Sequence, residues 1–256
     1  MLINTGNPEV TLDTNILEIE VPAYMEKGIS TGIEHVDLLC AGDGMIPTTV
    51  LLLTGVPGSG KTTLSLQLAD GITSKGNVCI YNSCEESLVQ LRKTTRRLSL
   101  RHGFIPSYFQ DLKELQLHAE AAQVKFPDKQ LFLIIDSLQT VEWSDPDKKT
   151  GRPYAPETMR VRIAWEMANW AKRTKSIVIL IGQVNKDGTF SGRQEIKHAI
   201  DAHMHLDYNR DRYSENYRER QAEMEKNRFG NAGISYPFEL TTKGVVFHYS
   251  SATIKK

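Results

Sequence analysis

A glycine-rich segment at residues 55–62 has the composition and spacing of a phosphate-binding loop. It reads Gly-Val-Pro-Gly-Ser-Gly-Lys-Thr, a complete GxxxxGK[ST] motif, between an apolar run typical of a strand and a helical pattern. Glycines let the backbone curl so that successive N–H groups point at phosphate oxygens, and the following helix adds its positive N-terminal dipole. A glycine-rich turn arising by chance would lack this strand–loop–helix setting. We therefore predict that the chain binds a nucleoside triphosphate.

Each position in this loop has an expected contact with the nucleotide or its metal ion. The Lys61 ammonium is expected to bridge the β- and γ-phosphates, and the Thr62 hydroxyl to hold Mg²⁺. The cofactors predicted from this segment are therefore ATP or ADP and Mg²⁺. The residues expected to contact them are Gly55, Val56, Pro57, Gly58, Ser59, Gly60, Lys61, Thr62 and Thr63.

Two further strand-like runs end in acidic residues that suit phosphate chemistry. One ends at Asp136, a Walker B type carboxylate that would hold Mg²⁺ directly or through its water shell. Ser137 follows it, where many related ATPases place the glutamate that orients the attacking water. The run at 78–82 leads instead to Glu85 and Glu86, and the carboxyl ends of parallel strands converge on the ligand crevice. We predict that Glu85 is the base, the alternative being a pair of acids that merely begins a helix.

A third strand-like run, at 176–182, is followed by Gln183. Its amide suits sensing of the γ-phosphate by a hydrogen bond, and it would pass the nucleotide state to the loop beyond. A glutamine that simply ends a strand is the alternative. Gln183 joins Lys61 and Glu85 among the candidate catalytic residues.

Strand-like and helix-like patterns alternate along the middle of the chain. The expected strands are 49–54, 78–82, 131–135 and 176–182, and the expected helices are 61–74, 86–98, 110–122 and 157–174. Such alternation indicates an α/β fold with a mostly parallel central sheet flanked by helices. Later strand-like pieces indicate an antiparallel C-terminal extension, at 202–207, 236–241 and 244–249. The charge-rich stretch 209–225 reads as a solvated helix or loop.

Composition sets bounds on the class of protein. Lys+Arg and Asp+Glu number 31 each in 256 residues, so any DNA contact must come from local loops and not from a basic surface. Cys40, Cys79 and Cys84 lack the spacing of a zinc ribbon or a disulfide framework. No signal peptide and no apolar run long enough to cross a bilayer are seen. We expect a cytoplasmic protein with no membrane partner.

Five segments of the sequence form a recognisable set: Ile29–Asp37, Cys84–Ser87, Ile134–Thr140, Asn185–Gly188 and Lys226–Gly230. Through them the sequence from Gly28 to about Ser250 resembles the ATPase domain of the RadA/Sms family, bacterial RecA-like proteins that promote branch migration during recombination. The last, Lys-Asn-Arg-Phe-Gly, is the most specific, and a related Lys-x-Arg pair occurs in DnaB-type hexameric helicases. The resemblance implies a RecA-like P-loop NTPase core at 29–256, after an N-terminal arm or linker at 1–28.

The chain departs from this family in two respects. It has no four-cysteine zinc module before the ATPase region and no Lon-protease-like domain after it. A minimal bacterial or phage-encoded relative and an excised domain both fit this pattern. The departures leave nucleotide binding intact but bear on DNA recruitment and on the full branch-migration role.

The resemblance also implies functions for residues that their own patterns do not single out. Lys226 and Arg228 would project into the neighbouring subunit's nucleotide site and neutralise charge on the γ-phosphate in the transition state. Two charges on a solvated turn are the alternative. The same resemblance implies a homo-oligomeric ring, a hexamer, whose channel loops bind single-stranded DNA. The cations that would contact DNA are Lys148, Lys149, Arg152, Lys186 and Arg193, unless these loops are ordinary polar surface.

Together, these features predict a DNA-stimulated, Mg²⁺-dependent ATPase of the RadA type. It would act as a ring-shaped motor on single-stranded DNA in recombination and repair, by branch migration or helicase-like remodelling, with a recombinase or replication protein as a further partner. The rival interpretation is a KaiC-like ATP-driven switch or scaffold with no DNA role, which would share the phosphate loop and paired glutamates. The segments Lys226–Gly230 and Asn185–Gly188 favour the DNA motor.

Overall fold

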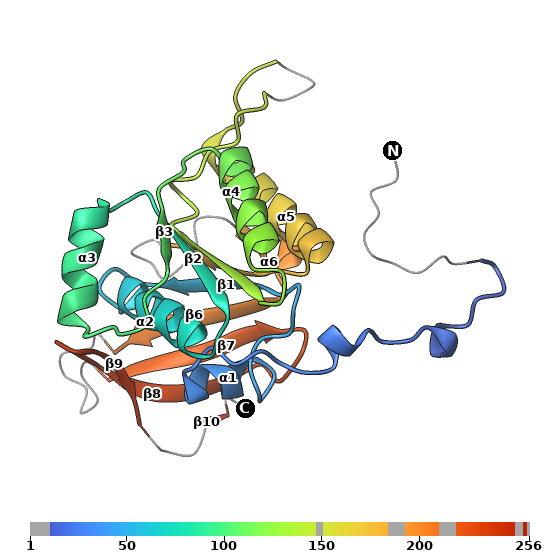
Figure 1. Cartoon of the computed structure of the whole chain (residues 1–256). Coiled ribbons are helices and arrows are strands. Elements are labelled where there is room, and N and C mark those ends of the chain that lie inside the picture. The colour runs from blue at the N-terminus through green and yellow to red at the C-terminus, as the bar shows by residue number, and fades with distance from the viewer. Residues whose placement is uncertain (1–10, 147–150, 184–192, 210–218, 249–252, 255–256) are drawn as a thin grey trace.

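The computed structural model describes residues 11–146, 151–183, 193–209, 219–248 and 253–254. The strands are β1 (Val50–Gly55), β2 (Val78–Ser83), β3 (Ile105–Ser107), β4 (Leu131–Asp136), β5 (Ile177–Ile181), β6 (Ala202–Tyr208), β7 (Arg220–Asn227), β8 (Ile234–Thr241), β9 (Gly244–Phe247) and β10 (Thr253–Ile254). The helices are α1 (Glu34–Cys40), α2 (Lys61–Ser74), α3 (Leu88–Arg97), α4 (Leu112–Lys125), α5 (Pro156–Thr174) and α6 (Arg193–Ala199). Within these ranges the ten strands form one sheet in the order β10-β8-β7-β6-β1-β5-β4-β2-β3, with β9 paired to β8 (Figure 1).

The centre of the sheet is parallel, and its strands are apolar along most of their length. β1, β2, β4 and β5 are buried at every position, as strands covered on both faces must be. The predicted mostly parallel α/β sheet with an antiparallel C-terminal extension is confirmed. One detail differs: the segment 202–207, predicted to be antiparallel, forms β6 parallel to β1. The connection from β5 through α6 returns the chain to the end of the sheet where β5 began, so β6 runs in the same direction as β5. The antiparallel extension therefore begins at β7.

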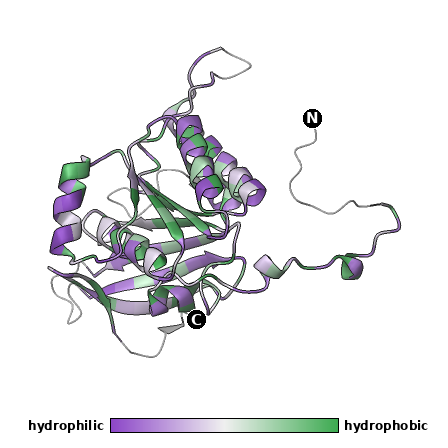
Figure 2. Cartoon of the chain, viewed as in Figure 1, coloured by the Kyte–Doolittle hydropathy of each residue, from purple (hydrophilic) through white to green (hydrophobic). Residues whose placement is uncertain are grey.

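Two apolar cores lie on opposite faces of the sheet. Alternate side chains of a strand point to opposite faces, and β1 shows this directly. Its Leu51 and Leu53 pack in the core covered by α1, α2 and α3, whereas Val50 and Leu52 pack in the core covered by α4, α5 and α6. Figure 2 shows hydrophobic residues along the central strands and mixed colours on the helices. Helices therefore hold the sheet from both sides and leave its strand ends available.

The charge-rich stretch 209–225 is the element that the sequence predicted wrongly. Residues 210–218 lie outside the described residues, but Arg220–Asn227 forms β7, antiparallel to β6, and not a solvated helix or loop. Ala222 and Met224 are fully buried on one face of β7. Two apolar residues among charged ones give too weak an alternating pattern to predict a strand. Helices α1 and α6 and strand β3 are likewise missed, because each has seven residues or fewer.

The segment at 11–28 extends away from the sheet (Figure 1) and contains two 3-10 turns, η1 (Ile16–Glu18) and η2 (Ala23–Met25). The side chains of Leu12 and Leu17 are exposed. The division into an arm or linker at 1–28 and an ATPase domain at 29–256 stays a prediction. Among the described residues, no helix combines the length and apolar character that crossing a membrane requires.

Candidate nucleotide site

The sheet brings the predicted phosphate, metal and base residues to one edge. The phosphate loop follows β1, and Asp136 ends β4. Glu85 lies two residues beyond the end of β2, and Gln183 lies two residues beyond the end of β5. Ser83, the last residue of β2, pairs with Asp136 in the sheet. The carboxyl ends of these parallel strands therefore meet where a ligand of an open α/β sheet binds.

The phosphate loop has a backbone shape that glycine makes possible. Gly58 and Gly60 have φ angles of 78° and 111°, in the left-handed region. Lys61 Nζ donates to the carbonyl oxygens of Gly55 at 2.7 Å and Val56 at 3.1 Å, so the ammonium lies over the loop. Burial lowers the pKa of Lys61 below its ordinary value, although two nearby carboxylates oppose this effect. An added anion at this point would restore the preference for the charged ammonium.

The start of α2 is suited to an anion. Its N-cap Gly60 supplies no side-chain cap, which leaves the N–H groups of the first turn to another acceptor. Ser59 is fully buried, and no hydrogen-bond partner within the described residues satisfies its Oγ. A buried hydroxyl without a partner is costly, and a phosphate oxygen would satisfy it. These features fit the phosphates of ATP or ADP.

Asp136 lies at the centre of a buried hydrogen-bond cluster. Its Oδ2 accepts from the Tyr81 hydroxyl at 2.6 Å and from the Thr62 hydroxyl at 3.2 Å, and the Tyr81 oxygen lies 3.0 Å from Ser65 Oγ. Burial raises the pKa of Asp136 above its ordinary value, the Tyr81 hydrogen bond opposes the rise, and the charge of Glu85 adds to it. A divalent cation would offset this unfavourable environment, and hydroxyl and carboxylate oxygens are ligands that Mg²⁺ accepts. Thr62 and Asp136 therefore fit the predicted metal position.

Two side chains hold Glu85 at the same edge. Its Oε1 accepts hydrogen bonds from the Ser137 hydroxyl and from the Gln183 amide, the second at 3.1 Å. Ser137 thus occupies the position after Asp136 where many related ATPases carry the base, and it contacts the glutamate supplied by the neighbouring strand. The structure brings the predicted base and the predicted sensor into direct contact. The contact from Ser137 was not predicted.

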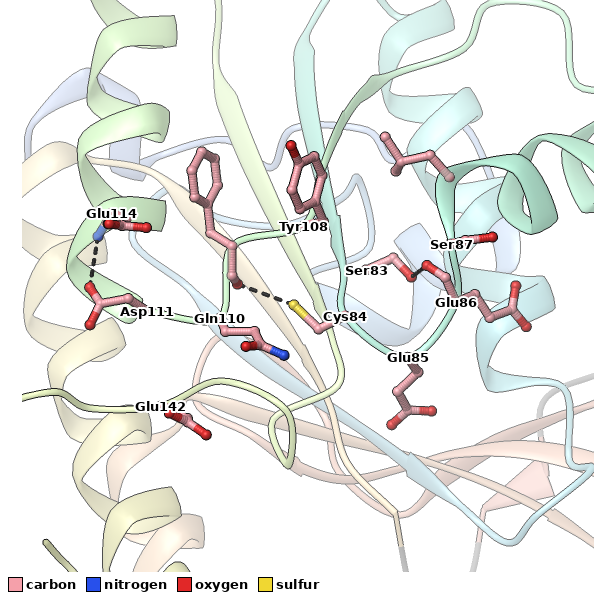
Figure 3. A pocket seen from close by; sticks show the side chains of 12 residues that line it. Ser83, Cys84, Glu85, Glu86, Ser87, Tyr108, Gln110, Asp111, Glu114 and Glu142 are labelled. Carbon is pink, nitrogen blue, oxygen red and sulfur yellow. Dashed lines mark hydrogen bonds between the residues drawn. The ribbon is translucent and has the colours of Figure 1, made fainter.

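An acid-lined hollow opens beside Glu85, at the ends of β2 and β3 (Figure 3). Its volume is about 870 Å³. The carboxylates that line it belong to Glu85, Glu86, Asp111, Glu114 and Glu142. Like charges repel, so this concentration of acids disfavours phosphate groups. The hollow suits water or cations, and the phosphate loop on the other side of Glu85 suits the nucleotide.

Arg220 contacts the site although no motif indicates it. From the first position of β7, its Nη1 donates to the carbonyl oxygens of Gly58 at 3.1 Å and Ser59 at 3.3 Å. Its guanidinium carbon also lies 4.7 Å from the centre of the Tyr208 ring. Arg220 therefore braces the phosphate loop from the β6–β7 pair. Because this contact joins Arg220 to a residue 162 positions earlier in the chain, local sequence could not have identified it.

Lys226 and Arg228 lie near the end of the β6–β7 pair that is opposite to the phosphate loop of their own subunit. β7 is antiparallel to β6, so their end of β7 pairs with the start of β6. Gly55, at the beginning of the loop, pairs instead with Leu206 near the other end of β6. At about 3.3 Å per residue, these two positions are about 13 Å apart along the strand. The structure therefore does not place these two predicted residues with the other members of the site.

Both side chains are held by the segment around the end of α6. Lys226 Nζ donates to the carbonyl oxygens of Lys197 and Ile200, the second at 2.7 Å. Arg228 Nη1 donates to Asp201 Oδ1 at 2.9 Å, and the Arg228 side chain remains 48% exposed. Burial and the nearby charge of Arg228 lower the pKa of Lys226. The pair is fixed in direction and reaches the surface.

The predicted DNA contacts fall mostly outside the described residues. This applies to Lys148, Lys149 and Lys186. Arg193 is the first residue of α6, and Arg152 is exposed. A role of these residues in DNA binding stays a prediction.

Comparison with known proteins agrees with this architecture. The family described as "ATPase: KaiC" matches residues 29–103. A KaiC-like protein from Pyrococcus horikoshii OT3 superimposes with a TM-score of 0.67 at 19% identity, covering 87% of this chain and 99% of that chain. A second solved structure, described as an ATPase domain, superimposes with a TM-score of 0.72 at 16% identity, covering 86% of this chain and 91% of that domain. The fold is that of the RecA-like P-loop ATPases.

Sequence similarity points to one group within this class. The chain is 32% identical to the DNA repair protein RadA of Mycobacterium tuberculosis over 225 residues, which cover 88% of this chain and 44% of that protein. The chain thus spans less than half the length of the curated relatives that it matches. It has the fold of the RecA-like P-loop ATPases and is similar over most of its length to RadA proteins, as the motifs predicted.

Replacing Tyr81 by Phe tests the cluster around Asp136, because it removes the donated hydrogen bond and keeps the ring. Loss of that bond lets burial raise the pKa of Asp136 further. We expect the Mg²⁺ concentration for half-maximal nucleotide binding to rise about 10-fold, since a hydrogen bond to a charged group is worth about 1.5–3 kcal/mol. The defect should be larger at about pH 6 than at about pH 8, because protonated Asp136 is a poor metal ligand.

Mg²⁺ titrations of both proteins at the two pH values measure this effect. Tyr108→Phe, at an exposed tyrosine, is the matched control and should leave the midpoint unchanged. A Tyr81→Phe midpoint equal to that of the parent protein would mean that Asp136 does not depend on this hydroxyl.

Proposed function

We propose that the chain is a Mg²⁺-dependent ATPase stimulated by single-stranded DNA, working as a homo-oligomeric ring, a hexamer, in DNA repair and recombination. The similarity to RadA, described as a DNA repair protein, supports the role in repair. Movement on DNA by branch migration or helicase-like remodelling, with a recombinase or replication protein as partner, follows from the same similarity. The nucleotide site supplies the physical argument for this proposal.

One contact carries the proposal: the hydrogen bond from Gln183 to Glu85. Glu85 lies beside the metal position, and the segment 184–192 that follows Gln183 contains Lys186, one of the predicted DNA contacts. A side chain that touches the base would sense the state of the γ-phosphate, and the residues that follow it in the chain would receive that signal. A switch of this kind links nucleotide state to DNA through a single residue.

Within one site, the residues of the chain divide the work of phosphoryl transfer. The N–H groups of the loop and the Lys61 ammonium bind and orient the phosphates. In the described part of the chain, both hydrogen bonds to Glu85 end on Oε1, so Oε2 is the oxygen that takes a proton from the attacking water. Mg²⁺ held by Thr62 and Asp136 would neutralise charge on the phosphate oxygens.

The position of Lys226 and Arg228 supports assembly. Their side chains do not reach the phosphate loop of their own subunit, yet Arg228 reaches the surface. If a second copy packed its phosphate loop against the surface that carries Lys226 and Arg228, both cations would lie next to that copy's nucleotide site. A lone chain would then lack the charges that stabilise the transition state, and it would hydrolyse ATP slowly.

Glu85→Gln tests the base. The amide keeps the shape and the hydrogen bond from Gln183 but accepts no proton, so we expect ATP binding to persist and turnover to fall by about 10²-fold or more. Glu86→Gln, at the adjacent exposed glutamate, is the matched control and should retain turnover. Fluorescent-nucleotide binding and steady-state phosphate release measure the two quantities. Equal losses in both variants would argue against Glu85 as the specific base.

Mixed assemblies test the shared site. Lys61→Ala should weaken nucleotide binding, and Arg228→Ala should bind ATP but turn over about 10²-fold more slowly. The Arg228→Ala subunit keeps an intact phosphate loop, and the Lys61→Ala subunit keeps an intact Arg228. In an equal mixture, about one quarter of the interfaces bring these two intact parts together. We therefore expect the mixture to regain about that fraction of parental activity. A mixture no more active than its components would rule out a role for Arg228 across the interface.

Steady-state ATP hydrolysis with and without single-stranded DNA tests the partner. We expect stimulation by DNA that weakens as salt rises, because phosphate contacts release counterions. Activity per subunit should also rise with protein concentration, since assembly completes each site. A slow rate indifferent to DNA would favour the rival function, a KaiC-like switch or scaffold, which the match of residues 29–103 also allows.

A further inference from the structure

A line of polar side chains crosses the buried sheet from β1 to β7, outside the nucleotide site. Thr54 is fully buried, and its Oγ1 lies 2.7 Å from His203 Nε2 and 2.8 Å from His205 Nδ1. The other ring nitrogen of His203, Nδ1, lies 2.9 Å from Glu225 Oε2, and Lys197 Nζ of α6 lies 3.1 Å from the same oxygen. Thr54, His203 and Glu225 are named the relay.

The two ring nitrogens of His203 face different partners, Thr54 and Glu225. A carboxylate only accepts, so the tautomer with its proton on Nδ1 suits the side of His203 that faces Glu225. In that tautomer Nε2 accepts from the Thr54 hydroxyl, whose oxygen can accept from His205 Nδ1. The adjacent His203 ring, with help from Lys197, lowers the pKa of Glu225 to about 2, and burial lowers the pKa of His205. The Thr54 hydroxyl is the hydrogen-bond partner of His203 Nε2, so its removal leaves a buried ring nitrogen without that partner.

A β-bulge places Glu225 in this line. His203 pairs with Lys226 and Met204 pairs with Met224, so Glu225 is an extra residue in β7. A bulge interrupts the alternation of a strand and re-aims its side chains. Glu225 accordingly contacts His203, while Lys226 turns to the carbonyl oxygens around the end of α6. The bulge and the relay together fix the direction of Lys226.

We propose that Thr54, His203 and Glu225 are positioning residues that hold Lys226 and Arg228 in place for the neighbouring subunit's site. This inference rests on the proposed function, in which those two cations act across the interface. Thr54 directly precedes the phosphate loop, so the relay connects the loop of one site to the side chains that serve the next site. A subunit with a broken relay keeps the residues of its own loop but presents Lys226 and Arg228 out of position.

The test places relay substitutions in one member of the mixed assembly. Thr54→Val removes the hydroxyl with little change in size, and Thr54→Ser keeps the hydroxyl as the matched control. Each is combined with Lys61→Ala, whose own site is inactive, and mixed with Arg228→Ala, whose own site is intact. Damage to the substituted subunit's own loop then cannot alter the rate, whereas misplaced Lys226 and Arg228 can. We expect Thr54→Val to lower turnover of the mixture about five-fold, and Thr54→Ser to preserve it.

The outcomes separate this inference from the proposed function. If the mixture without relay changes regains no activity, the role of Arg228 across the interface fails. If it regains activity and Thr54→Val in the Lys61→Ala subunit leaves the rate unchanged, the relay inference is overturned. A loss seen only when Thr54→Val is in the Arg228→Ala subunit overturns it too, because Thr54 would then serve only its own loop.

A second variant covers the case in which Thr54→Val does not assemble. Glu225→Ala breaks the relay at its partly exposed end, away from the phosphate loop, and should lower the rate in the same arrangement. Size-exclusion chromatography of each mixture reports assembly. An assembled Glu225→Ala mixture at the parental rate would overturn the inference on its own.

Discussion

A carboxylate inside an apolar parallel sheet must be compensated, and the nucleotide site is arranged around that requirement at Asp136. β4 is buried along its whole length, so its carboxyl end is the place where a charged group can meet polar neighbours. Tyr81 from β2 and Thr62 from α2 donate to the same oxygen of Asp136. The contacts of Asp136 thus join the start of α2 to the neighbouring strand, and the next residue, Ser137, contacts the base Glu85. Burial that is unfavourable for the free carboxylate favours the binding of a cation there.

The parts of the site that could be predicted are those that a continuous segment specifies. The phosphate loop and Asp136 follow from spacing within a few residues, and the rule that parallel strand ends converge predicted that Glu85 and Gln183 would lie nearby. The contact between those two residues bears out this reasoning. The catalytic roles assigned to these residues stay predictions.

The remainder depends on pairing between distant strands, which local patterns do not encode. Arg220 lies in a charge-rich stretch, and nothing around it distinguishes it from its neighbours except its contact with Gly58, 162 positions earlier in the chain. His203 and His205 alternate as strand residues do, but the significance of the pair appears only when Thr54 is found between their rings. β6 itself was predicted antiparallel, since a strand's direction is set by its crossover and not by its own composition.

The β6–β7 pair touches its own phosphate loop through Arg220 and carries Arg228 beyond its other end. In the proposed assembly, this pair would span the distance between two successive active sites. β7 has eight residues, and a paired strand neither stretches nor compresses readily. The length of β7 would then help to set the distance from one site to the next. The number of copies that close a ring would depend in part on that distance.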